Sequence, residues 1–313
     1  MEHTRKKISL VAPFYNEEAG VARFFDKINL VFGPVLERYD LEVVCVNDGS
    51  RDNTLDELKR ARESNPYIRV IDFSRNFGKE AAITAGLDFA NGDIVVPIDS
   101  DLQHPPEVVL DMLQKWEEGF EVVLARRVDR TTDHPIQKVA AKAFYQMSRN
   151  ITHVEIPADI GDFRLMDRKV VEALKTLREN CRFMKGLFAW VGFRTTVVDY
   201  RVAPRTHGKS SFSFWKLWNF ALDGITSFST VPLRIWTYLG AAVSFLAFLS
   251  GLYLIAKTLI LGADTPGYAS IMVVVLFSTG VQLIGIGILG EYLGRIFSEA
   301  KRRPPYIVRE VIE

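Results

Sequence analysis

The chain has 313 residues, with 39 Lys and Arg against 38 Asp and Glu, which gives a formal net charge of +1 at pH 7. This balance argues against a nucleic-acid-binding protein, because such proteins carry a basic excess. The sequence has no internal repeat and no low-complexity run. We interpret its mean hydropathy of +0.06 as the average of a charged domain and an uncharged apolar region. The two cysteines, Cys45 and Cys181, agree with a reducing compartment.

Three apolar segments near the start of the chain are predicted to be strands that end in polar residues. Residues 8–14 precede Tyr15-Asn16-Glu17, residues 41–46 precede Asn47-Asp48-Gly49-Ser50, and residues 95–98 precede Asp99-Ser100-Asp101. Helical patterns separate them, which predicts βαβ units and an α/β fold with a mainly parallel sheet. Ligands of such sheets bind outside the carboxyl ends of the strands, so we expect the polar clusters to form one site.

Asp99 and Asp101 are candidate metal ligands. Side chains two residues apart on a strand point to the same face, so both carboxylates can converge on one cation. A hard divalent ion such as Mg²⁺ or Mn²⁺ takes oxygen ligands, and Mg²⁺ is usually held by one or two carboxylates together with substrate phosphates. The alternative is a solvated turn after the strand. Glu17 and Asp48 at the same edge favour the metal site, because the crevice would otherwise be strongly anionic.

Four motifs, taken in chain order, carry a family resemblance. They are Pro13-Phe14-Tyr15-Asn16-Glu17, Asn47-Asp48-Gly49-Ser50, Arg75-Asn76-Phe77-Gly78-Lys79 and Asp99-Ser100-Asp101-Leu102-Gln103. Together they resemble the inverting glycosyltransferases of family two, which have the GT-A fold. The closer resemblance is to the polyprenyl-phosphate branch, which includes dolichol-phosphate mannose synthases and bactoprenol glucosyltransferases, and it covers essentially the whole chain.

The resemblance implies roles for residues at the donor site. It implies that the nucleotide sugar is held by Pro13, Tyr15, Asn16, Glu17, Val46, Asp48, Lys79 and Ser100. Asp48 is expected to accept the ring N–H of the base. Asp99, Asp101 and Gln103 match the positions that bind the metal and the diphosphate. Lys79 also stands where a helix is predicted to begin, and a lysine there can simply be solvated.

The resemblance also implies residues near the acceptor. Arg127 matches the arginine that follows a family strand, although Arg126 beside it is an alternative. Asp162 and Arg164 belong to a family-like Asp-Phe-Arg-Leu segment that is expected on the acceptor side, with Asp162 as an orienting residue or, less favoured, a base. A local ion pair between Asp162 and Arg164 is the structural alternative.

The scattered histidines, His104 among them, show no zinc-ligand spacing and are expected to be surface or local partners.

The second half of the chain predicts a membrane anchor. Residues 235–256 and 268–290 carry no charged side chain, and each is long enough to cross a bilayer. The alternative is a pair of buried hairpin helices. We expect a cytoplasmic catalytic domain over 1–209, juxtamembrane amphipathic helices over 210–234, an external loop over 257–267 and a cytoplasmic tail over 291–313. This tail can add an edge strand to a sheet.

Flanking charges predict the orientation. Arg234 precedes the first span, and the second is followed by Arg295, Lys301, Arg302 and Arg303. The positive-inside rule then puts the catalytic domain and both termini in the cytoplasm, at the cell inner membrane. A basic cluster before the juxtamembrane helices can bind the acceptor phosphate or anionic lipid headgroups, and it also resembles a family segment. Its members are Arg201, Arg205, His207 and Lys209, and Ser210 in the same family-like segment is a further candidate for binding the acceptor phosphate.

These features predict an enzyme that moves a hexose, with glucose from UDP-glucose favoured, onto undecaprenyl phosphate with inversion. Relatives that use mannose, N-acetylhexosamines or aminoarabinose have similar motifs, so another sugar is the first alternative. A non-catalytic nucleotide-binding membrane scaffold is the second. The resemblance implies a homo-oligomer, a tetramer. The glycines of the second span allow close helix packing, either between subunits or within the hairpin of one subunit. Flipping of the product is expected to need a separate protein.

Overall fold

The computed structural model describes residues 5–128, 160–177, 179, 184–201, 231–261 and 267–313. The chain forms two compact units. The first comprises Met1–Trp218 together with Arg303–Glu313, and the second comprises Asn219–Arg302. The C-terminal end of the chain therefore belongs to the first unit. The predicted acceptor residues Arg205, His207, Lys209 and Ser210, and most of the predicted juxtamembrane helices, lie outside the described residues.

The first unit contains an eight-stranded sheet with the order β7-β5-β6-β4-β1-β2-β3-β8. The strands are β1 (Lys6–Phe14), β2 (Tyr39–Asn47), β3 (Ile68–Phe73), β4 (Ile94–Pro97), β5 (Val122–Arg127), β6 (Ile160–Asp167), β7 (Thr195–Tyr200) and β8 (Val308–Ile312). Strands β4, β1, β2 and β3 are parallel neighbours, and β7 is parallel to β5. Strands β6 and β8 pair antiparallel with their neighbours. The predicted mixed, mainly parallel α/β sheet is confirmed.

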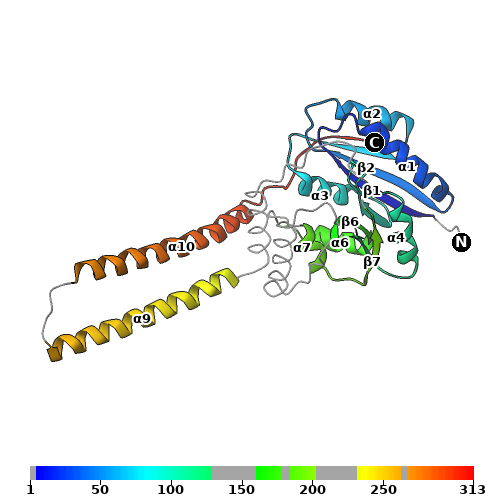
Figure 1. Cartoon of the computed structure of the whole chain (residues 1–313). Coiled ribbons are helices and arrows are strands. Elements are labelled where there is room, and N and C mark those ends of the chain that lie inside the picture. The colour runs from blue at the N-terminus through cyan, green and yellow to red at the C-terminus, as the bar shows by residue number, and fades with distance from the viewer. Residues whose placement is uncertain (1–4, 129–159, 178, 180–183, 202–230, 262–266) are drawn as a thin grey trace. The chain divides into compact units, whose positions relative to one another are not determined.

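Helices alternate with the strands, as the apolar patterns predict (Figure 1). They are α1 (Val21–Phe32), a short 3₁₀ helix η1 (Gly33–Glu37), α2 (Thr54–Ser64), α3 (Lys79–Phe89), α4 (Val108–Glu117), α6 (Arg168–Thr176) and α7 (Met184–Trp190). Residues 43–46 of β2 are 0% exposed, so both faces of this strand are covered. Such burial explains its continuous apolar run, which is typical of parallel strands with helices on both faces.

Helix α3 packs unusually close to β1. A Cβ atom on Gly86 would lie 2.0 Å from Cγ1 of Val11, so a larger side chain would push the helix away from the sheet. Helix α3 begins at Lys79, directly after Gly78, whose φ of +97° suits glycine. This packing holds the first residue of α3 at the carboxyl ends of the neighbouring strands.

The C-terminal tail adds an edge strand to the sheet, as its sequence predicts. Strand β8 pairs antiparallel with β3, with Val70 opposite Ile312 and Phe73 opposite Val308. Lys59 on α2 lies 3.5 Å from Glu310 on the strand. The segment that follows the apolar hairpin is therefore part of the same sheet as the N-terminal strands.

The second unit contains two long apolar helices, α9 (Val231–Leu261) and α10 (Tyr268–Ala300). Ile235–Tyr253 and Phe277–Ala300 are long and apolar enough to cross a membrane, and almost none of either stretch is buried. The two helices meet where a Cβ on Gly285 would lie 1.9 Å from Nε1 of Trp236. Their exposed apolar surface indicates membrane association, since soluble domains rarely leave so much of it open to water.

Candidate active site

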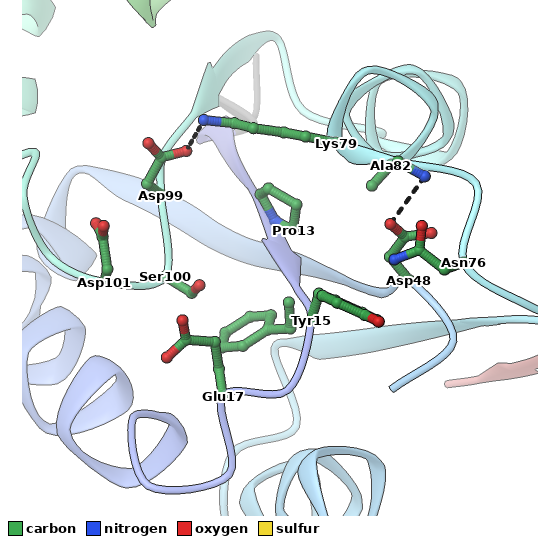
Figure 2. A pocket seen from close by; sticks show the side chains of 12 residues that line it. Pro13, Tyr15, Glu17, Asp48, Asn76, Lys79, Ala82, Asp99, Ser100 and Asp101 are labelled. Atoms are coloured by element: carbon green, nitrogen blue, oxygen red, sulfur yellow. Dashed lines mark hydrogen bonds and ion pairs between the residues drawn. The ribbon is translucent and has the colours of Figure 1, made fainter. Parts of the chain in front are cut away.

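A cavity of about 300 Å³ opens at the carboxyl ends of β1, β2 and β4. It is lined by Pro13, Phe14, Tyr15, Glu17, Asp48, Asn76, Gly78, Lys79, Ala82, Asp99, Ser100 and Asp101. Figure 2 shows Asp48 and Asn76 toward one end, Asp99 and Asp101 toward the other, and Pro13 between them. We call these the nucleoside end, after the role that the family resemblance implies for Asp48, and the carboxylate end. The structure thus gathers on one cavity the three polar clusters that the sequence places after separate strands.

Backbone amides hold Asp48 at the nucleoside end. The carboxylate is 3% exposed, and it accepts hydrogen bonds from Phe77 N–H at 2.6 Å and Gly78 N–H at 2.9 Å. Burial raises the pKa of Asp48, while the two amides oppose that rise. Gly49 allows the loops to meet, because a Cβ there would lie 2.3 Å from the Arg75 carbonyl carbon. The acid is therefore fixed to the 74–78 loop before any ligand arrives.

The loop after β1 supplies one wall. Asn16 adopts a positive φ of 53°, its N–H donates to Ser50 Oγ at 3.0 Å, and its Oδ1 accepts from Arg51 N–H at 2.9 Å. These bonds tie the loop to the one after β2 and leave Tyr15 45% exposed at the cavity. Asn16 thus holds the two neighbours that line the cavity. Val46 is fully buried in β2 and is not among the lining residues.

Lys79 bridges two acids at the carboxylate end. Its Nζ lies 2.6 Å from Asp99 Oδ1 and 3.7 Å from Asp162 Oδ2 (Figure 2 shows the pair with Asp99). Burial alone would lower the pKa of Lys79, but the two carboxylates raise it. Burial likewise opposes ionisation of Asp99, yet the Lys79 ammonium holds the pKa of this acid below its usual value. The structure therefore brings Asp162 to the same site as Asp99.

Asp101 is the exposed acid of the pair. It lies in the turn after β4, directly before Leu102, whose φ is 57°, and its Oδ1 accepts the Gln103 N–H at 3.0 Å. Burial and the neighbouring Asp101 raise the pKa of Glu17, which reflects the crowding of negative charge here. Among the described residues, no three His, Cys, Asp or Glu side chains form a ready-made metal cluster. The carboxylate pair is thus a partial set of hard oxygen ligands, which suits a cation that arrives with a diphosphate.

His104 is a neighbour of Asp99 that the sequence does not place at the site, although it is not among the residues that line the cavity. Its side chain is 14% exposed, and Nδ1 lies 3.6 Å from Asp99 Oδ2. The ring stacks on Phe163 with 4.8 Å between centroids and meets Tyr200 edge-on at 6.1 Å. Burial lowers the pKa of His104 despite the nearby Asp99. Metal-ligand spacing could not reveal it, because its partners come from β6 and β7, far along the chain.

The structure separates the two candidate arginines on β5. Arg126 makes a two-pronged contact with Asp199 on β7, through Nε at 2.7 Å and Nη2 at 3.0 Å. Arg127 is paired in register with Tyr200, and its charge lowers the pKa of that phenol, although burial raises it overall. Tyr200 is also the residue that packs on His104. Arg127 therefore lies toward the carboxylate end.

Arg164 is buried and is not among the residues that line the cavity. It is 5% exposed, donates from Nη2 to the Gly161 carbonyl at 2.7 Å and lies 3.9 Å from the Phe188 ring centroid. Burial lowers the pKa of its guanidinium to about 10, although Asp162 favours the charged form. Its Nε is a buried donor without a hydrogen-bond acceptor. Arg164 thus links β6 to α7 through its contact with Phe188.

Comparison with known proteins identifies the family. The model for glycosyl transferase family 2 matches residues 9–175, and the model for the GtrB C-terminal hairpin matches residues 231–296. A bactoprenol glucosyl transferase of Shigella phage SfV is 49% identical over 97% of this chain and 98% of its own length. An uncharacterised glycosyltransferase of Synechocystis is 50% identical over 97% of this chain and 95% of its own.

Solved structures include glucosyl-3-phosphoglycerate synthase from Mycobacterium tuberculosis, which was determined with Mn²⁺, UDP-glucose and phosphoglyceric acid. It is 22% identical, with a TM-score of 0.46, over 71% of this chain and 78% of that one. The family model and the close relatives confirm the resemblance drawn from the motifs. The chain is a glycosyltransferase and belongs to glycosyl transferase family 2, with the GtrB type of C-terminal hairpin.

Proposed function

We propose that this protein transfers glucose from UDP-glucose to undecaprenyl phosphate at a membrane surface, with inversion at the anomeric carbon. One observation carries the proposal: a cavity with acids at both ends stands in the same chain as two membrane-length helices. The first feature suits a nucleotide sugar with its cation, and the second suits a lipid acceptor. Relatives named bactoprenol glucosyl transferase support the choice of sugar and lipid.

Asp99, Asp101 and Gln103 would hold a divalent cation, Mg²⁺ or Mn²⁺, together with the donor diphosphate. The fit rests on the exposed Asp101 carboxylate and on Asp99, which already binds a cationic group, the Lys79 ammonium, at 2.6 Å. When bound, the metal would offset the negative charge that grows on the diphosphate as it leaves, an effect worth several kcal/mol in a preorganised site. Lys79 lies where its ammonium can reach the same diphosphate.

The acceptor phosphate is the nucleophile. One of its oxygens forms a bond to the anomeric carbon while the bond from that carbon to the diphosphate oxygen breaks and its electron pair leaves with the UDP. A phosphate monoester with a second pKa near 6 is mostly dianionic at neutral pH, so the attacking oxygen needs little help from a base. Asp162, 3.7 Å from Lys79, would orient groups on the acceptor side. Arg127 would reduce the repulsion between the two anions.

We propose that α9 and α10 cross the membrane as a hairpin, with the sheet domain and both termini in the cytoplasm. Strand β8 follows the hairpin and pairs with β3, which precedes it, so the chain must return to the side from which it left. Basic residues at both ends of the hairpin favour the cytoplasmic side. Arg205, His207, Lys209 and Ser210 are proposed to bind the acceptor phosphate. A homo-oligomer and a separate flippase complete the proposal.

The test is transfer of labelled sugar from a panel of UDP- and GDP-sugars to undecaprenyl phosphate, with the full-length protein in detergent and Mg²⁺ or Mn²⁺. We expect label in the lipid from UDP-glucose, and its loss with chelator or with Asp101→Ala. If only a different donor supports transfer, the assigned sugar would change, but the proposed type of reaction would stand. No transfer from any donor by folded protein would contradict the function and favour a nucleotide-binding scaffold.

A further inference from the structure

Buried polar side chains cluster where β2 and β3 end, and the proposed reaction uses one of them. Asn47 is 1% exposed, Asp48 is 3% exposed and Asp72 is 1% exposed. Asp48 lines the cavity, whereas Asn47 and Asp72 do not. A carboxylate as deeply buried as Asp72 is costly unless a cation or several hydrogen bonds compensate its charge. The partners of Asp72 therefore need an explanation.

The cation beside Asp72 comes from the C-terminal strand. Arg309 Nη1 lies 3.2 Å from Asp72 Oδ2, and Arg309 Nη2 donates to the Ser74 carbonyl at 2.8 Å. The pairing of β8 with β3 shifts register between Asp72 and Phe73, which is a local bulge. Bulges re-aim side chains, and here the guanidinium is aimed across the strand end. One arginine thus contacts both the buried acid and the start of the 74–78 loop.

A hydrogen-bonded path leads from Asp72 to the wall of the cavity. Asp72 Oδ1 accepts from Asn47 Nδ2 at 2.7 Å, and Asn47 Oδ1 accepts from Ser50 N–H at 3.4 Å. Ser50 Oγ in turn accepts the Asn16 N–H at 3.0 Å. Asn16 stands between Tyr15 and Glu17, which both line the cavity.

A second path runs through aromatic rings to Asp48. The Tyr306 ring stacks on Phe73 with centroids 5.2 Å apart, and Phe73 meets Phe77 edge-on at 5.7 Å. Phe77 N–H is one of the two donors to Asp48. Tyr306 is held in turn by its hydroxyl, which donates to Asp88 at 2.7 Å, and Ser74 N–H donates to the Ile307 carbonyl at 3.0 Å.

We propose that the C-terminal segment 306–309 is a positioning element for the nucleoside end, which sets the geometry of Asp48 and the Tyr15 loop without touching the donor. The aromatic path ends on Asp48, and the polar path ends on the Asn16 loop beside Tyr15. Neither path includes Lys79, Asp99 or Asp101. The segment follows the proposed membrane hairpin in the chain. It therefore connects the hairpin to the sheet and, in this proposal, also affects nucleotide binding. This inference rests on the proposed function in that a uridine nucleotide occupies the cavity.

The experiment measures UDP binding with Mn²⁺, together with donor and acceptor KM values, on the full-length protein in detergent. We expect Arg309→Gln to raise the Kd for UDP and the donor KM about tenfold, the size of one hydrogen bond to a charged group. The acceptor KM and the rate at saturating donor should stay unchanged. Arg309→Lys keeps the charge but lacks the two guanidinium nitrogens that contact Asp72 and the Ser74 carbonyl, so it should give an intermediate Kd. Tyr306→Leu tests the aromatic path and should also raise the Kd.

The matched control is Glu310→Gln on the same strand, where the removed contact is the exposed pair with Lys59 at 3.5 Å. It should leave the Kd for UDP at the wild-type value. A purely structural role for the segment would lower the melting temperature and the active fraction while leaving the Kd of the folded protein unchanged. That result would overturn the positioning role but not the proposed function. Wild-type UDP affinity in folded Arg309→Gln and Tyr306→Leu would have the same consequence. Wild-type protein that neither binds UDP nor transfers sugar would contradict the proposed function, and the positioning role with it.

Discussion

The two ends of the cavity hold their acids in different ways. At the nucleoside end, Asp48 is bound by two backbone N–H groups, from Phe77 and Gly78. At the carboxylate end, Asp99 is bound by the ammonium of Lys79, whose side chain is 47% exposed. Backbone donors in a packed loop are fixed, whereas an ammonium on a four-carbon chain can move to another anion.

This difference fits what each end has to do in the proposed reaction. A base is recognised by groups that already stand in place, because preorganised donors and acceptors cost little ordering on binding. The diphosphate and its cation enter and leave in every cycle, so their site must exchange partners. Lys79 can fill the cation position in the free protein and turn to the diphosphate when a metal arrives. The comparison predicts that substitutions at the two ends will change different quantities.

The largest effect is expected at the carboxylate end, from Asp101→Asn. The amide keeps the shape of the side chain but removes the negative charge that would hold the metal, so kcat/KM for sugar transfer should fall about 10²- to 10³-fold. Steady-state transfer assays at several Mn²⁺ concentrations measure it. Asp111→Asn, an exposed acid on α4 away from the cavity, is the control and should keep wild-type activity. Equal activity of the two variants would remove Asp101 from the proposed metal site.

A smaller and different effect is expected at the nucleoside end, from Asp48→Asn. An amide has one accepting oxygen, so Phe77 or Gly78 loses its acceptor and faces an NH₂ group instead. We expect the Kd for UDP to rise about tenfold or more, while the acceptor KM stays unchanged. Calorimetry with UDP and Mn²⁺ measures the first quantity. A fall in the saturated rate at unchanged Kd would show that the two ends do not divide the work as proposed.

The sequence predicts the strands and the edge on which the site lies because these depend on local patterns. Apolar runs that stop just before the polar clusters with Glu17, Asp48 and Asp99 identify both the parallel strands and their carboxyl ends. The strand added by the tail is also predictable from its apolar residues, although its partner β3 is not, since pairing depends on contacts far apart in the chain.

The rest of the site depends on tertiary packing. His104 lies beside Asp99 and packs against Phe163 and Tyr200, which belong to two later strands. Lys79 looks like an ordinary residue at a helix start until α3 packs closely on β1 and places it beside Asp99. The alternatives Arg126 and Arg127 are adjacent in sequence, and only the pairing with β7 separates them. Arg126 binds Asp199, whereas Arg127 stands opposite Tyr200.

Lys79→Met tests directly whether the Lys79 ammonium and a metal ion exchange at Asp99. Without the ammonium, Asp99 has lost the cation that competes with a metal, so Mn²⁺ should bind about tenfold more tightly in the absence of nucleotide. UDP binding without metal should weaken, since a basic group near the diphosphate is lost. Electron paramagnetic resonance of free Mn²⁺ measures the first quantity. Lys169→Met, which removes an exposed pair with Glu121, is the matched control. Unchanged or weaker Mn²⁺ binding in Lys79→Met would contradict the exchange.

The smallest effect is expected outside both ends, from Arg126→Gln. Its guanidinium contacts Asp199 at the surface, and exposed ion pairs contribute little to stability, so the melting temperature should not change and transfer should stay within about twofold of the wild-type rate.

Arg127→Gln is the informative partner, because Arg127 is in register with Tyr200 beside His104. Loss of its charge should raise the KM for undecaprenyl phosphate about tenfold and leave the donor KM unchanged. The reverse ranking of the two variants would move the acceptor phosphate to the Asp199 side of β5, away from the carboxylate end.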